Sequence, residues 1–135
     1  MSLVLATRIL LYVQFVLGIL QSPGLYNGVP ALLHTHRAVA FVFPIVAFLA
    51  FRPSATLPRI TAKTVARYGP GVSLVLGLVN WIGFKTFAII PAEAYFVVIA
   101  IHMLVGMAVV ACVEIASGKA RRAMVEAQID AVTSK

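Results

Sequence analysis

Long apolar stretches separated by short polar breaks make up most of the chain. They cover residues 3–20, 31–51, 70–90 and 93–117. Each stretch is close to the length of about 20 residues that an α-helix needs to cross a bilayer. A helix is expected because it satisfies all of its backbone polar groups within one segment. The pattern therefore predicts an all-α fold, a membrane-spanning four-helix bundle that residues 1–135 form as a single domain, with a short tail at 118–135.

Proline and glycine mark the expected helix boundaries. Pro30 suits the first turn of the second helix, where a missing backbone N–H costs nothing. The Gly-Pro-Gly run at 69–71 is expected to open the third helix, and Pro91 to open the fourth. Pro44 falls inside the second helix and is expected to bend it, because the proline ring removes a backbone hydrogen bond.

The composition supports a membrane environment. Hydrophobic residues make up 61% of the chain and charged residues 11%, whereas apolar usage near half is typical of soluble domains. The excess apolar surface is expected to face membrane lipids, and a larger membrane complex or further copies of the chain are the expected protein partners. The net charge of +7 does not indicate nucleic acid, because the basic residues stand between and after the apolar runs.

Basic residues also predict the orientation in the membrane. The loop between the second and third stretches carries no acid and several basic residues, namely Arg52, Arg59, Lys63 and Arg67. The tail begins with three more, Lys119, Arg121 and Arg122. Residues 21–33 carry no charge. Because loops rich in Lys and Arg stay on the cytoplasmic side, both termini are expected in the cytoplasm, and the chain in a bacterial or archaeal cytoplasmic membrane.

A short internal repeat suggests two related halves. Residues 16–21 (VLGILQ) in the first helix resemble residues 75–80 (VLGLVN) in the third. Each segment is followed by a helix that carries histidine near its outer half. The chain is therefore interpreted as two helical hairpins related by a pseudo-twofold axis, although Leu, Val and Gly are common in membrane helices.

Few polar side chains interrupt the apolar stretches, and these are the candidates for function: Gln14, His34, His36, Arg37, Asn80 and His102. Ionisable groups at membrane depth are costly, so they mark functional sites by default. Gln14 and Asn80 are expected to form hydrogen bonds between helices rather than to act as ligands. The single cysteine, Cys112, allows no intramolecular disulfide.

His36 and His102 stand in the second and fourth helices, which both run inward from the outer face. Along the helix axis His36 lies roughly 9 Å from Pro30, and His102 roughly 16 Å from Pro91. A helix tilt of about 20° can absorb this difference. Two imidazoles that face each other inside a four-helix bundle can bind a haem iron. His34 lies about 200° around the helix from His36, so only one of the two can face the core. His36 is favoured because it is deeper.

Arg37 follows His36 and points about 100° away from it around the helix. A guanidinium offers a carboxylate two parallel hydrogen bonds, so Arg37 is expected to pair with a haem propionate. For the histidines, the alternative interpretation is a hydrogen-bonded packing role without a cofactor. Small residues such as Gly77 and Gly106 would let a flat macrocycle approach, but ordinary helix packing is the preferred explanation for each of them.

Two segments resemble the haem A synthase-like membrane proteins. Residues 33–40 (LHTHRAVA) resemble the His-Arg-x-x-Ala/Gly stretch on the second helix of that family. Residues 98–106 (VIAIHMLVG) are similar to the histidine-bearing fourth helix of the same four-helix half. The order of parts also matches, since each pair has a first helix, an outer loop and then a histidine helix. The resemblance implies that His36 and His102 are haem ligands.

The chain departs from that family in ways that bear on its activity. The family places a glutamate just before the histidine of the second helix, whereas Leu32 and Leu33 occupy that neighbourhood here. The paired cysteines that some members carry in the first outer loop are absent from residues 21–33. The sequence also has no second four-helix half. The resemblance therefore supports haem binding more than it supports haem A synthesis.

These observations predict a small b-type haem-binding membrane protein, either a free cytochrome or a subunit of an electron-transfer complex. The sequence contains no Ser-His-Asp set, no Gly-rich phosphate loop and no paired carboxylates, which favours a protein without catalytic activity of its own. The alternative is an accessory subunit of a respiratory or photosynthetic complex, in which one histidine would ligate a (bacterio)chlorophyll magnesium. A transporter-like or structural protein with no cofactor is the third interpretation.

Overall fold

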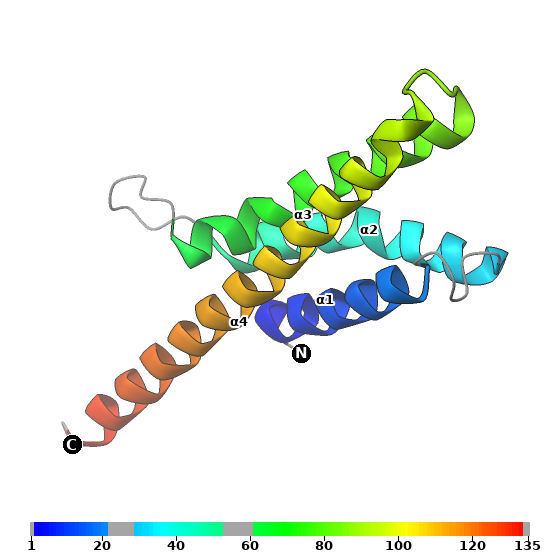
Figure 1. Cartoon of the computed structure of the whole chain (residues 1–135). Coiled ribbons are helices and arrows are strands. Elements are labelled where there is room, and N and C mark those ends of the chain that lie inside the picture. Colours follow the sequence, from blue (N-terminus) through cyan, green and yellow to red (C-terminus); the bar gives the residue numbers. More distant parts are fainter. Residues whose placement is uncertain (1, 22–28, 53–60, 134–135) are drawn as a thin grey trace.

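The computed structural model describes residues 2–21, 29–52 and 61–133, and these residues form helices with no strand among them (Figure 1). Four α-helices are present, as the sequence predicted: α1 (Leu3–Leu20), α2 (Pro30–Ala50), α3 (Ala62–Leu78) and α4 (Tyr95–Thr133). A π-helix, η1 (Val79–Thr86), continues α3, and a 3-10 turn, η2 (Ala92–Ala94), precedes α4. The all-α, four-helix prediction is confirmed.

Three of the described helices, α1, α2 and α4, are long and apolar enough to cross a membrane. This finding fits an integral membrane protein. The α-helical part of the third helix is 17 residues long, and the chain then continues as the 8-residue π-helix. The third span expected from the sequence is thus divided between two kinds of helix.

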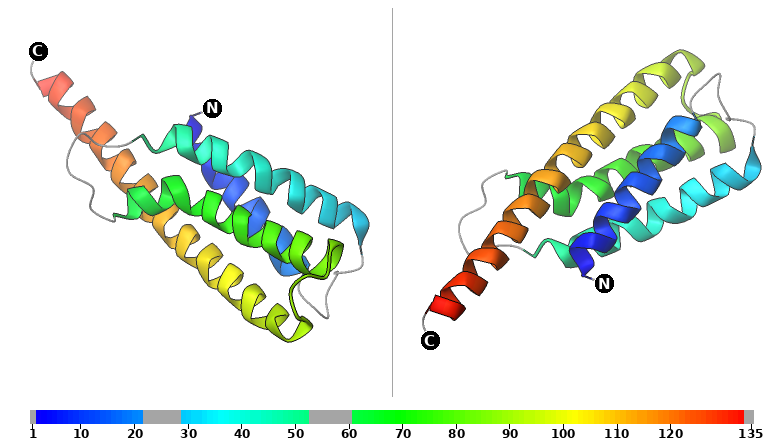
Figure 2. Two further views of the ribbon diagram at one scale, coloured as in Figure 1. Left: turned by 90° about the horizontal axis from the view of Figure 1, so that it is seen from above. Right: turned by 90° about the horizontal axis from the view of Figure 1, so that it is seen from below.

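The helices pack as two hairpins. α1 packs mainly against α2, and α3 packs mainly against α4, while contacts between α2 and α3 join the two hairpins. One end of the bundle holds the first turns of α1 and α3 together with the last turn of α2 (Figure 2). The chain therefore runs up and down through the bundle.

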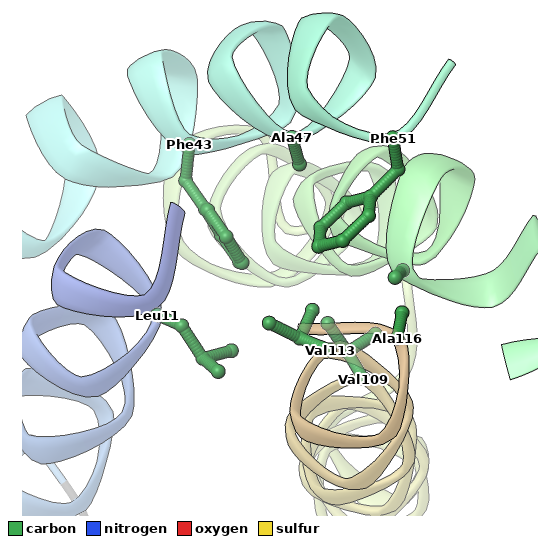
Figure 3. Packing of buried hydrophobic residues seen from close by; sticks show 8 residues of the cluster. Leu11, Phe43, Ala47, Phe51, Val109, Val113 and Ala116 are labelled. Atoms are coloured by element: carbon green, nitrogen blue, oxygen red, sulfur yellow. The ribbon is translucent and has the colours of Figure 1, made fainter. Parts of the chain in front are cut away.

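The buried apolar core lies in one half of the bundle, at this same end. Figure 3 shows its side chains from close by. It draws on the first half of α1, the second half of α2, the first turns of α3 and the middle of α4. Its members are Leu11, Phe43, Ala47, Phe51, Ala66, Val109, Val113 and Ala116. Several are small, so the helices approach closely here, as is common where membrane helices pack.

The third helix begins at Ala62, and not at the Gly-Pro-Gly run where the sequence analysis expected it. The Thr61 side chain accepts a hydrogen bond from the backbone N–H of Thr64, which caps the helix at this earlier point. Pro70 consequently lies inside α3, where it is buried next to Gly69. The capped first turns and the close packing on α4 hold the helix together past the proline.

The helical segment also ends earlier than the expected residue 90. Thr86 is the last residue of η1. Ala88 has a φ of 50°, which places a non-glycine residue in the left-handed region and ends the helix. The Ile90 backbone N–H then donates to the Gly83 carbonyl at 3.3 Å, which folds the segment back against η1.

The fourth helix continues through Gly118 to Thr133 without a break. The sequence analysis expected a helix over 93–117 followed by a separate tail. Gly118 costs the helix only about 1 kcal/mol relative to alanine, and the good helix formers that follow it, mostly Ala, Arg, Lys and Glu, carry the helix onward. All residues from 121 to 133 are exposed.

Two arginines make defined contacts at the core end of the bundle. Arg8 on α1 donates from Nε and Nη2 to the two carboxylate oxygens of Glu114 on α4, at 2.8 and 2.9 Å. This bidentate pair joins two helices that otherwise share few contacts. Arg67, expected as a loop charge, lies in α3 and donates to the Phe51 carbonyl at 2.9 Å. It thus caps the C-terminal end of α2. Arg59, which belongs to the same basic run, lies outside the described residues.

The close approach of α3 to α4 at Gly69 gives a stability prediction. A Cβ at Gly69 would lie 2.6 Å from Val109 Cγ2, and Val109 is itself buried and stiff. Gly69→Ala should therefore destabilise the protein by about 1–3 kcal/mol, as overpacking does. The measurement is thermal unfolding in detergent, followed by circular dichroism.

Gly71→Ala is the matched control on the same helix. A Cβ there meets nothing within 4 Å, and alanine favours a helix over glycine by about 1 kcal/mol. This variant should unfold at the wild-type temperature or above it. Equal destabilisation by both substitutions would show that the α3–α4 packing is not as described.

Candidate functional site

The second and fourth helices bring two histidines toward each other in the half of the bundle away from the core. His36 lies in the second turn of α2 and is half-buried, whereas His34 is exposed. His102 lies on α4 and is also half-buried. The two imidazoles are close enough to interact electrostatically. The structure thus places one histidine of each hairpin in the same part of the bundle interior.

Each imidazole lies against a glycine of the preceding helix. A Cβ at Gly18 on α1 would lie 3.5 Å from His36 Cε1, and a Cβ at Gly77 on α3 would lie 3.5 Å from His102 Cε1. A glycine leaves the helix backbone open at this point, so each ring can pack flat against the helix. The two hairpins therefore present their histidines in matching ways.

The residues one turn before the two glycines are also in equivalent positions beside the histidines. The His36 ring lies beside the backbone of Gln14, and the His102 ring lies beside the backbone of Ser73. Gln14 and Ser73 each precede their glycine by four residues. The structural equivalence thus includes both the glycine and the residue one turn before it, within the first and third helices.

Several polar atoms near the histidines are buried without a hydrogen-bond partner among the described residues. The Gln14 amide nitrogen contacts His36 Nε2 at 3.3 Å, which is the interhelical role that the sequence analysis expected for Gln14. The unpartnered atoms of this half are Gln14 Oε1, Gln21 Nε2, His36 Nδ1, Asn80 Oδ1 and His102 Nδ1. Buried polar groups normally have partners, so such a concentration needs an explanation.

The histidine half of the bundle has few buried residues. Among the described residues of this half, only Leu17 and Gly83 are buried, and the apolar core lies entirely in the other half. Figure 1 shows the α1–α2 hairpin diverging from the α3–α4 hairpin toward this end.

Arg37 and Trp81 link α2 to the π-helix at the same level. The Arg37 guanidinium carbon lies 3.9 Å from the centroid of the Trp81 ring, a cation–π contact. A guanidinium stacked in this way keeps its in-plane N–H groups available for an anion. π-Helical segments occur frequently at functional sites, and η1 carries both Trp81 and Asn80, whose Oδ1 atom has no partner among the described residues.

The ligand set limits which metal could bind. Within the part of the chain that the structure describes, no three His, Cys, Asp or Glu side chains come together as a metal site. Two imidazoles alone are too few for a structural zinc ion, which takes four protein ligands. They suffice for a metal whose macrocycle supplies the equatorial ligands, and haem iron is such a metal.

Some parts of the site were missed from the sequence. Gly18 and Gly77 were recognised as members of a short repeat, but not as the residues against which the histidines pack. The equivalence of Gln14 and Ser73 was hidden because the two residues differ in type, although their common spacing to the glycines was a signal. Trp81 gave no signal, because a lone aromatic residue in an apolar helix is ordinary.

Comparisons of the chain with protein-family models, with curated protein sequences and with solved structures find no match.

Proposed function

We propose that the chain is a small b-type haem-binding membrane protein that carries electrons, alone or as a subunit of an electron-transfer complex. His36 and His102 would hold the haem iron. The observation that supports this most is the placement of one half-buried imidazole from each hairpin in the same half of the bundle, near enough to interact. A neutral imidazole is a common metal ligand, and haem iron accepts one on each face.

The surrounding residues fit such a group. The two imidazoles are half-buried, and the glycines beside them let the rings lie close to the backbones of α1 and α3. Arg37 would pair with a propionate from its position over Trp81. When bound, a haem supplies one-electron chemistry. His36 from one hairpin and His102 from the other would hold the group.

The same proposal includes the topology. α1, α2, the combined α3–η1 segment and α4 each span the membrane, with both termini in the cytoplasm and the core end of the bundle on the cytoplasmic side. Lys63 and Arg67 in the first turns of α3, and Arg121 after the apolar part of α4, support this orientation through the bias of Lys and Arg to the cytoplasmic side. The matching surroundings of His36 and His102 support two hairpins related by a pseudo-twofold axis.

The haem hypothesis predicts a ligand-specific spectrum. The purified, reduced protein should show a low-spin b-type optical spectrum. His36→Ala and His102→Ala should each convert the haem to high spin or empty the site, because the iron loses an axial bond. His34→Ala is the matched control, since the exposed His34 side chain points away from the interior, and it should leave the spectrum nearly unchanged.

The outcomes separate the hypotheses. A wild-type protein that purifies from haem-sufficient cells without haem would contradict the proposal. If a pigment is bound instead and only one of the two histidine variants releases it, the accessory-subunit interpretation with a single magnesium ligand takes its place. Loss of haem in His34→Ala but not in His36→Ala would reverse the choice of ligand on α2.

The topology is tested with reporter fusions in the living cell. A reporter fused after Arg59 should read cytoplasmic, and one inserted at Asn27 should read external, because the basic residues around the second loop stay inside. Replacing Arg52, Arg59, Lys63 and Arg67 by neutral residues should give mixed insertion. External activity from the Arg59 fusion in the wild-type chain would contradict the orientation.

A further inference from the structure

The last turns of α4 extend beyond the bundle as a free helix. Every residue from 121 to 133 is exposed, and Figures 1 and 2 show this segment projecting past the other helices. A helix this short is marginal in water by itself, and most helical stability comes from packing of an apolar face. The exposed face of this segment therefore needs an explanation.

One side of the segment is an apolar seam. Val125, Ile129 and Val132 are 48%, 56% and 72% exposed. They follow one another at spacings of four and three residues, so they lie along one side of the helix. This is the spacing of the a and d positions of a coiled coil, with Val125 and Val132 at d and Ile129 at a.

Shallow hollows lie along the same seam. One is lined by Gly118, Arg121, Arg122, Val125 and Glu126. The next is lined by Val125, Gln128, Ile129, Val132 and Thr133. In a coiled coil each a or d side chain inserts into a hollow between four residues of the facing helix. The surface thus carries both the projecting side chains and the hollows that would receive them.

We propose that residues 118–133 pair with the same segment of a second copy of the chain as a parallel two-stranded coiled coil. The parallel arrangement follows from the membrane. α4 is apolar enough to span it, and two copies inserted in the same direction present their extensions side by side, pointing the same way. The twofold axis that relates the two copies then runs along the membrane normal, and the dimer is closed.

The charges beside the seam fit this partner. With Val125 at d, Arg121 occupies a g position and Glu126 the e position of the following heptad. In a parallel pair the g residue of one helix faces the e residue of the next heptad on the other, and opposite charges there set partner choice and orientation. Arg121 of each copy would thus face Glu126 of the other, which gives two ion pairs related by symmetry.

The segment is short, but two features lower the cost of pairing. The helix is already nucleated, because it continues α4 without a break. The membrane confines both copies and aligns them, which raises their effective concentration. Arg122 falls at an a position, where a charged residue weakens the pair but fixes its register. The structure therefore indicates a weak, register-specific contact.

Cysteine cross-linking of the full-length protein in native membranes tests the proposal. Cys112 is first replaced by serine, and single cysteines are then introduced as Val125→Cys, Val132→Cys and, as the matched control, Ala127→Cys. All three positions are exposed, but Ala127 lies on the opposite side of the helix from the seam. Mild oxidation should give at least fivefold more disulfide-linked dimer at Val125 and Val132 than at Ala127. Equal cross-linking at all three positions, or none at the two seam positions, would overturn the proposal.

A charge exchange tests the partner contact itself. In the Val132→Cys background, Arg121→Glu should lower the dimer yield severalfold, because the introduced carboxylate would face Glu126 of the other copy. Adding Glu126→Arg restores an opposite pair and the original net charge, and should restore the yield. If the double variant stayed as weak as the single one, the assigned register and the parallel pairing would be wrong.

Discussion

A polar side chain inside a bilayer has no water to pair with, and this constraint determines how the helices of this chain face one another. Imidazole, amide and guanidinium groups on otherwise apolar helices must turn toward other helices or toward a bound group. His36 and His102 accordingly turn into the bundle from separate hairpins, and Gln14 turns toward His36. At the other end of the bundle, Arg8 and Glu114 satisfy each other across α1 and α4.

The two halves of the bundle differ in how their residues pack. Small and apolar residues fill the core half, where α3 lies so close to α4 that Gly69 leaves no room for a methyl group. In the histidine half the hairpins diverge, few residues are buried and several polar atoms lack partners among the described residues. A well-packed end holds the two hairpins in fixed relation, so the histidines of the other end keep their relative positions without a core of their own.

The apolar pattern predicted the four helices and the all-α class, because long apolar runs leave the backbone few alternatives. It failed at three helix ends for local reasons. The Thr61 cap and the packing of Gly69 carried α3 through Pro70, the positive φ of Ala88 ended η1 early, and helix formers carried α4 past Gly118. The histidine pair was found because ionisable groups are rare in apolar helices. Trp81 under Arg37 was not, because no sequence rule shows that a π-helix will turn an indole toward the neighbouring helix.

The central claim is that His36 and His102 bind the same haem iron. Electron paramagnetic resonance of the oxidised wild-type protein, combined with a haem count per chain, tests it most directly. The account predicts one haem per chain with a low-spin ferric signal, because two imidazoles complete the coordination of the iron. A high-spin signal, two haems per chain or no haem at all would contradict it.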